Sequence, residues 1–177
     1  MPTAPTINHN NNNIQVNILG FGNEDLSHVT SERLRQIYES TPVKDILCRV
    51  IELLYFDGGS RGRNSTFIMP PPGTPGNQYA VIREPTDPRR IIFAPADDVA
   101  RHVATKGVDV IDESINIDDS SIYCELESEL HGRIDDHVTK LADILENEPT
   151  SEKGREITYK VSAALSDITR IAVSLTC

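Results

Sequence analysis

The chain has 177 residues, of which 38% are hydrophobic and 25% are charged, a composition typical of one folded domain rather than of a disordered chain. Its net charge is -10 and only 5% of its residues are aromatic, which argues against nucleic acid as a partner. No segment approaches 18 consecutive apolar residues, so we expect no transmembrane segment, while a peripheral membrane contact stays open.

The composition changes along the chain and divides it into a polar arm and one domain. Residues 1–13 are rich in Pro, Thr and Asn, which predicts a disordered arm, with a targeting or docking segment as the alternative. Residues 14–177 are predicted to form a single α+β domain, in which a small antiparallel sheet of about three to five strands packs with helices. We expect a strand and helices over 14–57, a β-rich and mildly basic part over 58–118, and an acidic helix pair over 119–177.

The first part begins with alternating apolar residues over 14–18, which predicts a short strand. A helix is predicted over 30–39 because Thr30, or the serine that follows it, can cap its N-terminus. Pro42 is well placed at the first position of a helix. Apolar residues three and four apart then predict a core helix over 42–57.

The middle part is rich in β-branched residues and is interrupted by proline-rich loops, which cannot continue a hydrogen-bonded ladder. The expected elements, in chain order, are three strands, a helix and a fourth strand: 66–69, 78–83, 90–93, 96–105 and 108–111. The short connections favour antiparallel pairing of the first three strands.

Two amphipathic helices are predicted at the end of the chain. Apolar residues recur every three or four positions from Ile122 to Leu145, and Pro149 ends this pattern. The second helix is expected to begin near Ser151. Because the connection between them is short, we expect an antiparallel pair.

Charge is segregated along the sequence. Residues 109–148 carry all of the excess negative charge, whereas residues 61–106 have a small excess of basic residues. We interpret these segments as two complementary binding surfaces; a solvated acidic face and a mobile polar loop over 58–65 are the alternatives. The candidate binding residues are Arg61, Arg63, Arg83, Arg89, Arg90, Glu125, Glu127, Glu129, Asp135 and Asp136.

The segment 122–131 resembles the active-site helix of zinc metalloproteases of the zincin fold, because Glu125 and Leu126 open a predicted helix that follows a β region. The motif His-Glu-x-x-His itself is absent. Cys124 and Ser128 stand where its two histidines would be. Because zinc needs three protein ligands at fixed geometry, we expect no metal, and no other cofactor is indicated.

The glutamates Glu125, Glu127 and Glu129 also resemble the paired glutamates of ADP-ribosyltransferases, with Ser65 and Thr66 in the place of the Ser-Thr strand motif. Those glutamates sit on a turn entering a strand. The apolar stripe here predicts a helix, which turns residues two apart to different faces. A solvated acidic face is therefore the favoured interpretation.

The three cysteines, Cys48, Cys124 and Cys177, are odd in number and widely spaced. This argues against a disulfide framework and favours a reducing compartment, such as the cytoplasm of the producing cell or of a host. If the chain is an enzyme, Cys124, Glu125 and His131 are the catalytic candidates.

Two hypotheses about function remain. The leading one is a non-catalytic protein-protein interaction or assembly protein, such as an oligomeric scaffold, a viral matrix-type protein or a chaperone-like adaptor. The predicted order of elements loosely resembles that of type III secretion chaperones, which implies a small, acidic dimer. Its partner would be another copy or a basic protein. The alternative is an effector-type hydrolase with a Cys- or Glu-dependent site at the zincin-like helix 122–131.

Overall fold

The computed structural model describes residues 19–56, 66–70, 79–116, 126 and 128–174. In chain order, its elements are α1 (Ser31–Ser40), η1 (Val43–Asp45), α2 (Ile46–Phe56), β1 (Phe67–Ile68), β2 (Tyr79–Arg83), β3 (Ile91–Pro95), α3 (Ala96–Asn116), α5 (Ser128–Asn147) and α6 (Glu152–Ser174). The predicted α+β class, with a small antiparallel sheet packed with helices, is confirmed. The predictions made for the arm over 1–13, the strand over 14–18 and the loop over 58–65 fall outside the described residues.

The first two helices form where capping and apolar spacing predicted them. The backbone N–H of Arg33 donates to the Thr30 side chain at 3.4 Å, which caps α1. Pro42 precedes the short helix η1, and α2 continues from it. Seven residues of α2 are buried, which makes it a core helix: Ile46, Leu47, Val50, Ile51, Leu53, Leu54 and Tyr55.

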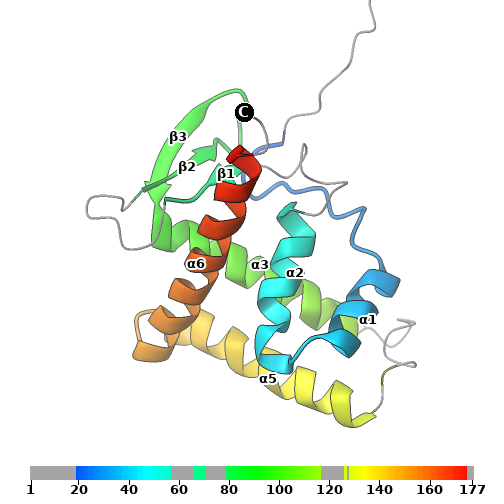
Figure 1. Ribbon diagram of the computed structural model, residues 1–177. Coiled ribbons are helices and arrows are strands. Elements are labelled where there is room, and N and C mark those ends of the chain that lie inside the picture. The colour runs from blue at the N-terminus through cyan, green and yellow to red at the C-terminus, as the bar shows by residue number, and fades with distance from the viewer. Residues whose placement is uncertain (1–18, 57–65, 71–78, 117–125, 127, 175–177) are drawn as a thin grey trace, which may run out of the picture.

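The sheet has the order β1-β2-β3, and both pairs are antiparallel as predicted. The backbone N–H of Glu84 donates to Arg90 O at 2.9 Å and closes the hairpin between β2 and β3. At the edge of the sheet formed by β1, the hydroxyl of Ser166 on α6 donates to Pro70 O at 2.6 Å, just after that strand. The bond from Ser166 ties the sheet to α6, at one end of the helical layer (Figure 1).

Helix α3 runs without interruption over Ala96–Asn116, so the predicted strand over 108–111 is wrong. The β-branched residues of that segment favour a strand locally. However, its buried residues recur at helical spacing and pack against α2, α5 and α6. Tertiary packing therefore overrides the local preference. The buried residues of α3 beyond its first turn are Ala100, Val103, Ala104, Gly107, Val108, Val110, Ile111 and Ile115.

The two final helices are present, but α5 begins at Ser128, later than predicted; Leu126 lies before it and 122–125 fall outside the described residues. The buried stripe of α5 is the expected one: Ile134, Val138, Leu141 and Leu145. A turn over 148–151 leads into α6. Both α5 and α6 pack chiefly on α3 rather than on each other.

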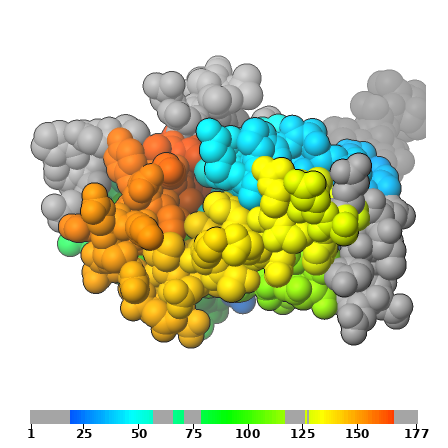
Figure 2. All heavy atoms as spheres, turned by 90° about the horizontal axis from the view of Figure 1, so that it is seen from below, coloured from blue at the N-terminus to red at the C-terminus, as the bar shows by residue number. Residues whose placement is uncertain are grey.

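The elements are arranged around α3. In Figure 1 the sheet lies above α3 and α5 crosses below it. Figure 2 shows the underside, where α5 (yellow) extends between α2 (cyan) and the C-terminal part of α3 (green). Within the described residues, no helix combines the length and apolar character that a membrane span requires.

Two glycines of the helices α5 and α6 allow a matched test of this packing. A Cβ added at Gly154 would lie 2.5 Å from Glu148 O and 2.6 Å from Pro149 O, whereas a Cβ at Gly132 meets no atom within 4 Å. We expect Gly154→Ala to lower the free energy of unfolding by about 1–3 kcal/mol, because backbone atoms cannot move aside. Gly132→Ala should raise it by about 0.5–1 kcal/mol, because alanine favours the helix. Urea unfolding of both variants measures the difference, and equal stability of the two would contradict the α5–α6 turn described here.

Candidate interaction site

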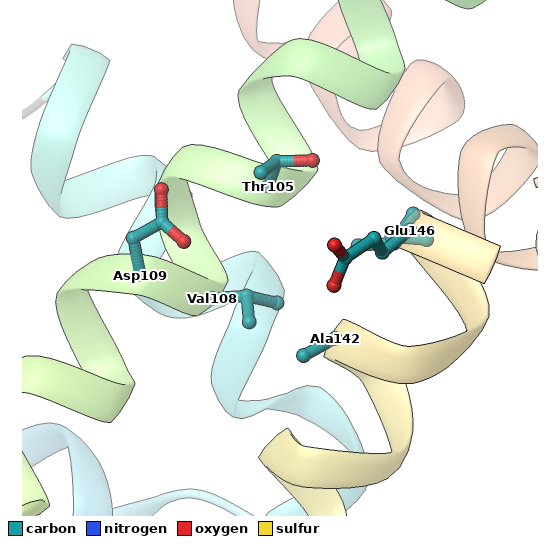
Figure 3. Close-up of a pocket in the computed structure, with 6 residues that line it drawn as sticks. Thr105, Val108, Asp109, Ala142 and Glu146 are labelled. Carbon is teal, nitrogen blue, oxygen red and sulfur yellow. The ribbon is translucent and has the colours of Figure 1, made fainter.

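A groove of about 370 Å³ separates α3 from α5. Each helix contributes three residues at the spacing i, i+3 and i+4, which places them on one helix face. They are Thr105, Val108 and Asp109 from α3, and Ala142, Leu145 and Glu146 from α5. Figure 3 shows Thr105 and Val108 of α3 across the gap from Ala142 and Glu146 of α5, with Asp109 on the far side of Val108.

The floor of this groove is apolar and its rims are acidic. Val108 and Leu145 are buried, whereas Asp109 and Glu146 are exposed. Neither carboxylate has a hydrogen-bond or ion-pair partner among the described residues. An apolar floor between two carboxylates suits a Lys or Arg side chain, which has an aliphatic stem and a cationic end.

The acidic candidates predicted from the sequence lie elsewhere. Glu125 and Glu127 fall outside the described residues, and Glu129 is exposed in the first turn of α5. Asp135 is half-buried, and Asp136 accepts a hydrogen bond from Lys140 at 2.5 Å. None of these described acids lines the groove between α3 and α5.

Sequence reasoning missed Asp109 and Glu146. The signal that could have found them is shared by both: each follows directly after a buried apolar residue of an amphipathic helix, Val108 and Leu145. Residues at such positions lie at the edge of a packed face, where a neighbouring helix forms the other wall.

Three of the five arginine candidates are described, and all three lie in the β2–β3 hairpin or at its base. Arg83 donates to Pro88 O at 3.2 Å, and Arg90 pairs with Glu84 at 3.5 Å. Arg89 is exposed; its backbone N–H donates to Asp87 Oδ1 at 3.2 Å, whereas its guanidinium forms no ion pair among the described residues. Arg61 and Arg63 fall outside those residues. The hairpin and α5 lie at opposite ends of the molecule (Figure 1).

A second groove of about 550 Å³ lies between the start of α3 and the start of α6. Its charged residues are of both signs: Asp97, Arg101 and Arg155. Arg101 also pairs with Asp98 at 3.3 Å. Because these charges largely compensate one another, the groove selects neither anions nor cations by its net charge.

The catalytic candidates are not brought together among the described residues. Cys124 and Glu125 fall outside them. His131 lies 3.2 Å from Ile115 O through its Nε2, a contact that joins α5 to the end of α3. No group of three or more His, Cys, Asp or Glu residues in the described ranges could hold a metal ion.

Comparisons of this chain with known protein families, with curated proteins and with solved structures found no match.

Cys48, on α2, provides a test of thiol chemistry. Burial, together with the carboxylates of Asp45 and Glu52, raises the pKa of the Cys48 thiol above its ordinary value. A raised pKa leaves less of the reactive thiolate near neutral pH. In a Cys124→Ser, Cys177→Ser variant, we expect iodoacetamide to alkylate Cys48 at least about fivefold more slowly in the folded protein than in urea. Equal rates in the folded and unfolded states would contradict this placement of Cys48.

Proposed function

We propose that the chain is a non-catalytic assembly protein in which a basic segment of one copy binds the acidic groove between α3 and α5 of another copy. The observation that carries this proposal is the pair Asp109 and Glu146, which line a groove with an apolar floor and form no ion pair among the described residues. The basic segment we assign to this contact is the β2–β3 hairpin, where Arg89 is exposed and its guanidinium forms no ion pair in the described part of the chain.

The chemistry of the two surfaces is complementary. An arginine stem covers apolar surface while its guanidinium stays at the rim, where carboxylates can accept its hydrogen bonds. Thr105 is exposed at the same rim and can accept a further N–H donor. Opposite charges on the two surfaces would also steer copies into this orientation.

The positions of the two surfaces determine the kind of assembly. Because the hairpin and α5 lie at opposite ends of the molecule (Figure 1), one copy cannot satisfy its own groove. A contact between different surfaces on two copies is head-to-tail, and it produces rings or filaments depending on whether the rotation closes. If the partner is instead a separate basic protein, it would bind the same groove, and no ring or filament of copies would form.

The hydrolase alternative has no supporting observation. Cys124 and Glu125 lie outside the described residues, and His131 is engaged with a backbone carbonyl. The proposal of an assembly protein therefore rests on the groove and the hairpin alone.

Charge reversal tests this contact. We expect Glu146→Lys to weaken self-association about tenfold, or about 1.4 kcal/mol, because it places like charges together. Arg89→Glu should do the same, and the double variant should recover most of the loss, since the reversed pair is again complementary. Sedimentation velocity in about 0.01 M salt, where the Debye length is about 30 Å, measures all three.

The control is Asp143→Lys, which makes the same change in net charge on α5 at an exposed position outside the groove. Association of this variant should stay close to that of the wild type. The proposal is wrong if Asp143→Lys and Glu146→Lys weaken association equally, or if Glu146→Lys weakens association as much in about 1 M salt, where the Debye length is about 3 Å, as in low salt.

A further inference from the structure

One face of the sheet is apolar and is left uncovered by the helices and strands of the described residues. The register places Ile68, Val81 and Phe93 side by side across the three strands. Tyr79 and Ile91 lie two residues from this row and therefore on the same face. On the opposite face, Phe67, Ala80 and Ile82 are buried in the core.

The large hydrophobic side chains on this face have more than half of their surface exposed. Phe93 is 74% exposed, Ile91 59%, Tyr79 57% and Ile68 53%. Among the residues up to Ser166 whose side chains the structure describes, one other large hydrophobic side chain is as exposed, Tyr159 on α6. The exposed large apolar side chains of these residues are thus gathered on one sheet face, as at an interface, rather than scattered.

The area is sufficient for a two-fold contact. An aromatic side chain has about 150–250 Å² of surface, so Phe93 and Tyr79 together expose on the order of 250 Å². With the two isoleucines and the half-buried Val81, the patch reaches roughly 500 Å². Two such patches bury on the order of 1,000 Å² in total when they meet, which is about the lower limit for a specific protein interface.

The distribution of charge favours a second copy as the occupant. The chain has a net charge of -10, and its groove carboxylates lie between α3 and α5, on the far side of α3 from the sheet (Figure 1). Two copies that meet through their sheets therefore keep their acidic helices as far apart as the fold allows. The charged side chain on this face, Arg83, is folded back onto Pro88 O of its own hairpin.

We infer that the open face of the sheet binds the same face of a second copy, so that two sheets stack around a two-fold axis near Phe93. Such a contact is isologous, with one surface used by both copies, and stacked sheets place their facing side chains in a shared apolar layer. The inference goes beyond the proposed assembly function and does not depend on the acidic groove. Because the contact is apolar, added salt screens the repulsion between the acidic copies and strengthens it.

The test is the sedimentation of the full chain in about 1 M salt, where the Debye length is about 3 Å and charge-driven contacts are suppressed. We expect the wild type to be a dimer of 19.6 kDa chains. Phe93→Asp should raise the dimer dissociation constant about thirtyfold or more, since an aromatic residue at the centre of an interface contributes strongly. Ile91→Asp should act in the same direction, so a folding defect in one variant leaves the other as a test.

The matched control is Tyr159→Asp, which replaces an aromatic residue of similar exposure, 65%, outside the sheet. It should leave the dimer intact, and circular dichroism should show the wild-type helix content in all variants. A wild-type monomer in about 1 M salt would overturn the inference, as would a dimer that survives both Phe93→Asp and Ile91→Asp. Binding of a monomer to neutral phosphatidylcholine vesicles that depends on Phe93 would also overturn the inference, because the face would then bind lipid rather than a second copy. A loss of the Glu146-dependent association alone would leave this dimer unaffected, so failure of the two proposals is distinguishable.

Discussion

The close approach of α2 to α3 is the constraint on which the rest of the structure depends. A Cβ at Gly107 would lie 2.8 Å from Leu47 Cδ1 and 3.1 Å from Ile51 Cγ1. The absence of a side chain there lets the two helices meet, and the buried alanines of α3, Ala100 and Ala104, keep the surrounding contacts short. Because α3 also contacts α5, α6 and the sheet, its position determines where each of them lies. The acidic groove and the open sheet face are both consequences of this central helix, one below it and one above it.

Much of the fold could be predicted from the sequence because the relevant signals are local. The cap at Thr30, the start at Pro42 and the proline-rich connections each act within a few residues. The strand predicted over 108–111 was wrong because its outcome depends on α2, α5 and α6, which a local pattern cannot include. Gly107 lies between the helix and the strand that were predicted, and in the structure it permits close packing of α3 on α2.

The candidate surfaces were harder to predict than the elements. The groove is built from residues more than 30 positions apart, Thr105 to Asp109 and Ala142 to Glu146, and exists only because α5 packs beside α3. On the sheet, the run Ile91-Ile92-Phe93 is apolar at every position, so it does not show which residues face the core. Only pairing with β2 settles that Ile92 points inward and Phe93 outward. The segregation of charge was visible in sequence, but the acids that line a concave site were not among those selected.

The two proposed contacts respond to ionic strength in opposite ways, and this difference follows from their chemistry. A contact between arginine and carboxylate weakens as salt screens it, whereas an apolar contact between acidic molecules strengthens as their repulsion is screened. A sheet-to-sheet dimer would leave both of its grooves outward, since each groove lies between α3 and α5 and α5 crosses on the far side of α3 from the sheet (Figure 1). Such a dimer presents the acidic groove twice, so contacts of a basic segment with two grooves gain from multivalency. At high ionic strength, apolar burial alone would set the size of the assembly, and at low ionic strength the charged surfaces would extend it.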